Sequence, residues 1–209
     1  MYIPRRYEEK DKDKIAAFIR ENSFALLVSV HQGIPVATHL PLLLKTGDDG
    51  KDRLLGHISK GNDQKISLQN GVKVLAVFAG PHAYVSPAWY TKMNVPTWNY
   101  ISVHVYGTVS IMEGEALKQA LSGMVDFYEQ GRTAPVKLEH IPEKTFEDDF
   151  RGIIGFEILI DEIQAAYKLS QNRDEQSYHQ VIHELSKGDE LSKKVAEEMQ
   201  ARQDGLFGK

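Results

Sequence analysis

Short apolar runs recur along the first half of the chain, and their length and turn-rich borders predict β-strands. Phe24–Val30 indicates a buried strand, and Val36–Lys45 indicates a second one that is interrupted at Pro41. Arg53–Ser59 and Val72–Phe78 continue the series. Turns rather than helices separate these strands, which favours an antiparallel sheet.

Further strands are predicted later in the chain. His82–Val85 is short, Trp98–Met112 is long and alternates in polarity, and Ile153–Ile163 places Phe156, Ile158 and Ile160 on one face. A parallel dinucleotide-binding sheet would need a helix after every strand, and its glycine-rich fingerprint is absent from the sequence. The pattern therefore predicts a mainly β fold with flanking helices, an α+β class, in which six or more strands form a closed or split antiparallel barrel.

Helical periodicity is confined to a few segments. Asp11–Asn22 repeats apolar residues every three or four positions, and Glu115–Gln130 is amphipathic and ends at a glycine. Asp174–Leu185 and Asp189–Arg202 predict a helical hairpin with each aspartate as an N-cap. We expect a barrel domain over residues 1–172 and a C-terminal helical extension, packed on the barrel, over residues 173–209.

Composition narrows the class of protein. The chain has 209 residues and no cysteine, which excludes disulfides and thiolate chemistry. The start of the chain carries no apolar run typical of an export signal, so we expect a cytoplasmic protein with no membrane partner. The net charge is −4, and the region from residue 174 onward holds eight acidic against five basic residues. This balance argues against a basic DNA-binding arm.

Polar residues interrupt two of the predicted strands. Thr38 and His39 lie in an apolar strand, where the ring either bonds to a backbone carbonyl or contacts a ligand at the barrel mouth. His57, Ser59 and the following segment 60–62, Lys-Gly-Asn, are compatible with an ordinary surface loop or with a phosphate cradle. Both interpretations remain open for each cluster.

Aromatic residues gather in the middle of the chain. Both tryptophans, Trp89 and Trp98, lie between residues 80 and 104, held among prolines, together with Asn99 and His104. Such a segment can form a wall for a planar ligand, a dimer interface or a plug at the barrel end. Residues 167–172 follow the last strand, and Lys168, Gln171 and Asn172 there can hydrogen-bond a phosphate or a carbonyl-rich ring.

Two other kinds of site fit the sequence poorly. His179 and His183 have a zinc-like spacing on a predicted helix, but the glutamate of the zinc-protease motif and a third ligand are missing, which favours a solvent-facing pair. Ser86 lacks the glycines of a hydrolase nucleophile turn. We expect no catalytic residue and no metal site.

Taken together, these segments resemble the PaiB family, described as FMN-binding negative regulators of sporulation and protease production. The matching segments are spread almost from end to end: residues 1–4 (MYIP), 33–42 (GIPVATHLPL), 56–57 with Asn62, 78–90 (FAGPHAYVSPAWY), 95–100 (VPTWNY), 103–104 and 168–172 (KLSQN). The resemblance implies a six-stranded Greek-key split barrel of the FMN-binding type that pairs as a homodimer.

The resemblance also implies where a cofactor would lie. Residues 38–41 would follow the isoalloxazine edge, the segment around Lys60 would take the phosphate, and Lys168 would approach from the C-terminal side. The residues expected to bind FMN or another planar ligand are Thr38, His39, His57, Ser59, Lys60, Asn62, Trp89, Trp98, Asn99, His104, Lys168, Gln171 and Asn172.

Two functions follow from this interpretation. The first is a cytoplasmic transcriptional regulator, a repressor of sporulation and extracellular protease synthesis that senses a flavin or a planar ligand and acts without direct DNA contact. The second is an enzyme, either an FMN-dependent oxidoreductase or a haem-handling protein of the same barrel class, for which His39, His57, His82 and His104 are conceivable ligands. The regulator is favoured because the sequence shows no obligatory acid–base pair.

Overall fold

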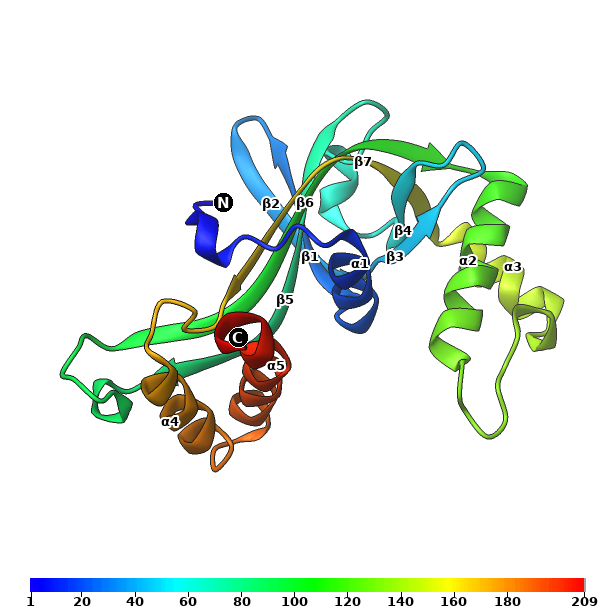
Figure 1. Ribbon diagram of the computed structural model, residues 1–209. Coiled ribbons are helices and arrows are strands. Elements are labelled where there is room, and N and C mark those ends of the chain that lie inside the picture. Colours follow the sequence, from blue (N-terminus) through cyan, green and yellow to red (C-terminus); the bar gives the residue numbers. More distant parts are fainter. Residues whose placement is uncertain (209) are drawn as a thin grey trace. The chain divides into compact units, whose positions relative to one another are not determined.

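The computed structural model describes residues 1–208 and divides into two compact units (Figure 1). Unit 1 comprises Met1–Phe18, Phe78–His104 and residues 164–208. Unit 2 comprises Ile19–Val77 and Val105–Ile163. One seven-stranded sheet has the order β2-β1-β5-β6-β7-β4-β3. The strands are β1 (Phe24–His31), β2 (Ile34–Pro41), β3 (Leu43–Thr46), β4 (Asp52–Ser59), β5 (Lys73–Val85), β6 (Thr97–Met112) and β7 (Ile153–Lys168).

The helices cover the predicted segments and add one. They are α1 (Lys12–Glu21), α2 (Gly114–Glu129), α3 (Glu143–Arg151), α4 (Glu175–Leu185) and α5 (Glu190–Phe207), with short 3-10 turns at η1 (Arg5–Tyr7), η2 (Asp63–Ile66), η3 (Pro87–Trp89) and η4 (Leu138–His140). The mainly antiparallel sheet with flanking helices confirms the predicted fold class. None of the helices formed by residues 1–208 is long and apolar enough to cross a membrane.

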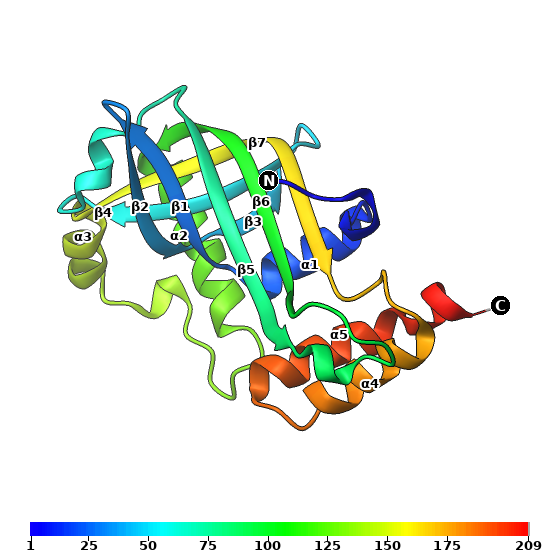
Figure 2. The same ribbon diagram turned by 90° about the vertical axis from the view of Figure 1, so that its left-hand side faces the viewer.

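Within unit 2 the sheet must curl upon itself. β2 pairs with β1 at one end of the strand order, and β3 pairs with β4 at the other end. Only Leu42 separates β2 from β3. A chain advances at most about 3.6 Å per residue, so the two ends of the sheet come within about 7 Å of each other at this point. Figure 2 shows β1 and β2 as a hairpin beside β5.

The sheet has seven strands rather than the six that the family resemblance implies, and the segment predicted as the second strand forms two of them, β2 and β3. Pro41 has no N–H group to donate to a ladder. The N–H of Leu42 donates to the carbonyl of Ser23 (2.8 Å), and the chain changes partner here, because β2 pairs with β1 and β3 pairs with β4. Leu42 itself is fully buried, and it packs against Gly56 of β4, where a Cβ atom would lie 2.7 Å from the Leu42 Cδ2.

Two predicted strands, Val72–Phe78 and His82–Val85, form one long strand. β5 runs without a break through Gly80 and Pro81, which separate the two apolar runs in the sequence. The register of β5 with β1 ends at Val77, so Pro81 breaks no hydrogen bond between these two strands. A Cβ at Gly80 would approach Phe18 to 2.5 Å, so the close packing of unit 1 requires a glycine there.

A buried polar side chain ties the hairpin of β1 and β2 to the turn η2 in unit 2. The Gln64 side chain is fully buried. Its Nε2 donates to the carbonyl of Leu27 (3.0 Å), the hydroxyl of Ser29 (2.9 Å) and the carbonyl of Val36 (3.2 Å). The turn is therefore fixed against both strands by hydrogen bonds as well as by packing.

The C-terminal hairpin of unit 1 confirms both predicted caps. The Asp174 side chain accepts from the N–H of Ser177 (2.9 Å) and Asp189 accepts from the N–H of Ser192 (2.8 Å). α4 and α5 lie side by side (Figure 1), and the buried Tyr178 hydroxyl donates to the carbonyl of Met199 (2.9 Å). The boundary at residue 172 between a barrel domain and an extension stays a prediction.

Candidate functional site

In unit 2 the structure brings together two of the residues expected to bind a ligand. The Asn62 Nδ2 donates to the Thr38 hydroxyl oxygen (3.0 Å), and the Asn62 Oδ1 accepts from the N–H of Gln64 (2.9 Å). Asn62 thereby caps η2 and joins it to the middle of β2. Thr38 keeps its hydroxyl hydrogen to donate to a ligand.

The loop after β4 uses its backbone N–H groups internally. The N–H of Lys60 donates to the carbonyl of Gly152 (2.8 Å), that of Gly61 to the Ser59 hydroxyl (3.1 Å) and that of Asn62 to the carbonyl of Ser59 (2.9 Å). These three amides are not free to form the backbone anion cradle that the glycine suggests. Anion binding at this loop must come from side chains.

Two ammonium groups provide that capacity. The Lys65 Nζ donates to the backbone carbonyl of Lys60 (2.6 Å), which brings the Lys65 charge to the loop that carries the exposed Lys60 side chain. Of these two lysines, only Lys60 is among the residues predicted from the sequence to bind a ligand, because Lys65 lies five positions further on. The 3-10 turn η2 brings the Lys65 side chain back to the loop.

The histidines of unit 2 differ in their surroundings. His57 is half-buried in β4, its buried Nδ1 has no hydrogen-bond partner within residues 1–208, and burial lowers the pKa of the ring. A buried nitrogen without a partner costs about 1–3 kcal/mol, so it marks a place where a ligand or water completes the structure. His39 is exposed on β2 and stacks on Phe24, with ring centroids 6.0 Å apart.

Unit 1 contains a cavity of about 410 Å³. The sequence-predicted Trp98 and Lys168 both line it, from β6 and β7. Aromatic side chains form much of the remaining wall, those of Tyr2, Tyr7 and Tyr100. The N-terminal contribution was not predicted from the sequence, although residues 1–4 carry part of the family resemblance, because nothing in the local pattern brings them beside β6 and β7.

Lys168 is the charged group of this cavity. Its Nζ donates to the Thr97 hydroxyl and to the Trp98 carbonyl, and lies 6.0 Å from the centroid of the Tyr100 ring. Burial, and secondarily the guanidinium of Arg173, lowers the pKa of Lys168. Both effects disfavour the ammonium form of Lys168. An anionic or carbonyl-rich ligand beside it would stabilise that form.

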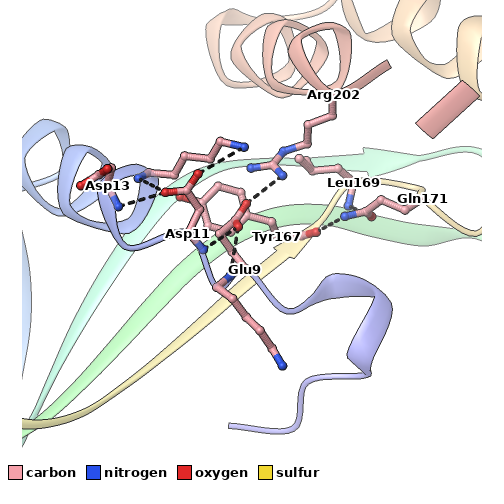
Figure 3. A network of polar contacts seen from close by, with 9 residues as sticks. Glu9, Asp11, Asp13, Tyr167, Leu169, Gln171 and Arg202 are labelled. Carbon is pink, nitrogen blue, oxygen red and sulfur yellow. Dashed lines mark hydrogen bonds and ion pairs between the residues drawn. The ribbon is translucent and has the colours of Figure 1, made fainter. Parts of the chain in front are cut away.

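The other predicted residues of unit 1 have local partners or lie at the surface. Asn99 is fully buried and exchanges hydrogen bonds with the Ser170 hydroxyl (3.0 and 3.1 Å). Gln171 closes the turn after β7 by accepting from the N–H of Leu169 (2.7 Å) and donating to the carbonyl of Tyr167 (Figure 3). Asn172 is exposed, and Trp89 is half-buried in η3.

His104 completes the set from unit 1. It is half-buried in β6, and its buried Nδ1 lacks a hydrogen-bond partner within the described part of the chain. Burial, and secondarily the N-terminal ammonium of Met1, lowers the pKa of His104. The predicted residues thus form two groups, one in each unit, and no cluster of three or more metal-ligating side chains occurs among residues 1–208.

The fold defines the class of protein as a split barrel. The chain is similar to the FAD and heme binding protein from Mycobacterium smegmatis, with a TM-score of 0.60, 18% identity and coverage of 78% of this chain and 73% of that one. It is also similar to the flavocytochrome Anf3 from Azotobacter vinelandii, with a TM-score of 0.58, 16% identity and coverage of 79% and 72%. At these identities the similarity establishes the fold.

Sequence comparison identifies the family. Residues 1–162 match the family described as "Putative FMN-binding domain", and the chain belongs to that family. It is 44% identical over 185 residues to "Protease synthase and sporulation protein PAI 2" of Bacillus subtilis, covering 88% of this chain and 89% of the relative. The resemblance to the PaiB family is thereby confirmed.

Proposed function

We propose that this protein is an FMN-binding regulator that represses extracellular protease synthesis and sporulation, and that it works in the cytoplasm as a homodimer. The family match over residues 1–162 supports the flavin, and the identity to a relative named for protease synthesis and sporulation supports the regulatory role. The acidic net charge of −4 supports an indirect effect on transcription.

The observation that carries the cofactor proposal is the pair of ammonium groups at the loop after β4. A flavin phosphate needs cations, and this loop offers Lys60 with Lys65 folded onto the Lys60 carbonyl (2.6 Å). The neighbouring Ser59 hydroxyl accepts from Gly61 and can donate its hydrogen outward. The donor set therefore fits a phosphate.

We assign the remaining proposed contacts to the flavin ring. In unit 2, Thr38 offers a hydroxyl hydrogen, His57 offers a ring nitrogen without a partner among residues 1–208, and His39 offers an exposed ring. The proposed contacts in unit 1 are Trp89, Trp98, Asn99, His104, Lys168, Gln171 and Asn172. When bound, FMN would supply one- or two-electron redox chemistry or act only as a sensed ligand. The chain's own residues bind and orient it.

Titration with FMN and riboflavin tests this assignment. Replacing Lys60 and Lys65 by Met should weaken FMN binding at least about tenfold, since one hydrogen bond to a charged group contributes roughly 1.5–3 kcal/mol. Riboflavin lacks the phosphate, so its affinity should not change. Lys51→Met, an exposed lysine in the loop between β3 and β4, is the matched control. Equal FMN affinity in the double variant and the control would refute the assignment.

The regulatory step is tested separately. A gel-shift titration with promoter DNA of protease genes, across a range of salt, should show only weak, salt-sensitive binding. Sequence-specific binding at physiological salt would show that the protein contacts DNA directly. Deleting the gene should raise extracellular protease activity if the protein is a repressor, and unchanged activity would contradict that role.

A flavin-dependent oxidoreductase or a haem-handling protein is the second candidate. Haem iron takes a neutral imidazole as its ligand. Burial lowers the pKa of both His57 and His104, which keeps these rings neutral, and each has a buried Nδ1 without a hydrogen-bond partner within residues 1–208. A Soret band after addition of haemin, lost in His57→Ala or His104→Ala, would favour haem binding. A colourless protein after haemin and FMN would exclude this candidate.

A further inference from the structure

The cavity of unit 1 has aromatic walls that solvent reaches. Tyr2 is 87% exposed and Trp98 is 54% exposed, although both line the cavity. Two rings of β5 hold Trp98 in place, since the His82 and Tyr84 centroids lie 6.2 and 6.0 Å from it. Fixed, exposed aromatic faces beside a cavity are typical of sites that stack a flat ligand.

The cavity also contains one directed cation. Lys168 uses two donors, to the Thr97 hydroxyl and the Trp98 carbonyl, and an ammonium group has three. These two hydrogen bonds therefore hold the ammonium in position and leave one N–H hydrogen for a ligand. Arg173, which helps to lower the pKa of Lys168, adds a second positive charge nearby.

The N-terminal wall of the cavity is anchored at both ends. The Met1 ammonium donates to the Gln164 side chain, and the N–H of Glu9 donates to the carbonyl of Ala165 in β7 (3.0 Å). Glu9 also forms an ion pair with Arg202 of α5 (2.9 Å), shown in Figure 3. A wall held in this way lowers the ordering cost of binding.

We propose that this cavity binds a flat aromatic molecule with carboxylate or carbonyl oxygens along one edge. The ring stacks against Trp98 and the tyrosines, and the oxygens accept a hydrogen bond from Lys168. This cavity shares Trp98 and Lys168 with the planar-ligand site of the proposed function, and to that extent the proposal rests on that function. Two sources share this chemistry: the pyrimidine edge of a flavin and an aromatic carboxylic acid.

Trp98 itself can report the binding. The chain has two tryptophans and so gives two indole N–H signals in NMR, and a spectrum of Trp89→Phe identifies the Trp98 signal by elimination, so that the titrations use the unsubstituted chain. Riboflavin and 2-naphthoate are the probes, titrated separately into the full chain. We expect a saturable shift of the Trp98 signal with at least one probe. A shift with riboflavin assigns the flavin ring to the cavity, and a shift with 2-naphthoate alone assigns an aromatic acid.

Variants separate this site from the phosphate loop. Lys168→Met should weaken binding of the active probe at least tenfold, whereas Lys92→Met, an exposed lysine of the same unit, should not. If Lys168→Met fails to fold, Tyr2→Ala, which removes a side chain that is mostly in solvent, should still weaken binding. Lys60→Met with Lys65→Met should leave these titrations unchanged while weakening FMN, so the two proposals can fail independently. No shift with either probe, or equal affinity in Tyr2→Ala, overturns the inference.

Discussion

The Glu9 carboxylate and the Arg202 guanidinium meet at 2.9 Å, across 193 positions of sequence. Arg202 also lies over the Tyr167 ring, 4.5 Å from its centroid, and the other Glu9 oxygen accepts from the N–H groups of Lys10 and Asp11 (Figure 3). The Glu9 side chain is only 11% exposed. This pair therefore fixes the start of α1 and the N-terminal segment to α5 within unit 1.

Removing this charge should make the protein less stable in a pH-dependent way. Burial raises the pKa of Glu9, but the N–H of Asp11 and the Arg202 guanidinium outweigh it and the net pKa lies below its ordinary value of 4.5. The stabilisation is therefore complete above pH 4.5 and is lost as pH falls through the lower folded-state pKa. Glu9→Gln should lower the free energy of unfolding at pH 7 by about 1–3 kcal/mol.

Thermal unfolding at several pH values measures this effect. Glu190→Gln is the matched control, since Glu190 pairs with Lys193 at 2.8 Å but is 84% exposed. An exposed pair contributes little, so the control should behave like the parent protein. The same stability for both variants at pH 7 would contradict a structural role for the Glu9 pair.

Gln64 should be far more sensitive to substitution than a surface glutamine. Gln64→Leu keeps the volume but leaves the carbonyls of Leu27 and Val36 without this donor. We expect a loss of about 2–4 kcal/mol in urea denaturation, since a buried polar group left without its partner costs roughly 1–3 kcal/mol. Gln69→Leu, at an exposed residue whose side chain donates to the Ile66 carbonyl, should change stability little. Similar losses for both variants would contradict the role given to Gln64.

Gly56 and Leu42 should be energetically coupled. A Cβ at residue 56 would lie 2.7 Å from the Leu42 Cδ2, so Gly56→Ala should cost about 1–3 kcal/mol through overpacking. Truncating Leu42 to Ala removes that clash, and the double variant should lose less stability than the sum of the two single losses. Additive losses, measured by denaturant unfolding of all four proteins, would show that the two residues do not compete for space.

The predicted dimer should depend on the loop between η3 and β6. Met93 is 90% exposed and Val95 is 66% exposed, which is unusual for large apolar residues of one loop. Met93→Glu with Val95→Glu should shift a dimer toward monomer in light scattering. Val136→Glu, at another exposed apolar residue, is the control. A parent protein that is monomeric, or a dimer unchanged by the loop substitutions, would contradict the prediction.

Hydrophobic patterning was sufficient for most strands and for four of the five helices. Hydrophobic patterning failed for segments in which exposed charged side chains interrupt or outnumber the apolar ones. α3 (Glu143–Arg151) is acidic and has no buried residue, so its pair of phenylalanines gives too weak a period. β7 continues to Lys168 although Asp161 and Glu162 interrupt the apolar pattern, because both charges are exposed.

The candidate site was predictable only in part. Residues near one another in sequence, such as Ser59 and Lys60, were found from local composition. The contribution of Tyr2 to the same cavity as Trp98 and Lys168 depends on pairing across the chain, which a single sequence does not encode locally. Asn99 shows the opposite difficulty. Its residue type suggests a ligand contact, but its side chain is buried and bonds to Ser170.

The single residue between β2 and β3 has a consequence for chain length. Side chains alternate between the two faces of a strand, so a one-residue slip in either pairing would move every side chain of that strand to the opposite face of the sheet. With Leu42 alone as connection, β2 cannot slip on β1 without pulling β3 along β4. The register of each strand pair therefore fixes that of the other. The barrel should tolerate insertions in the loop at residues 47–51, whereas even one residue added beside Leu42 should destabilise it.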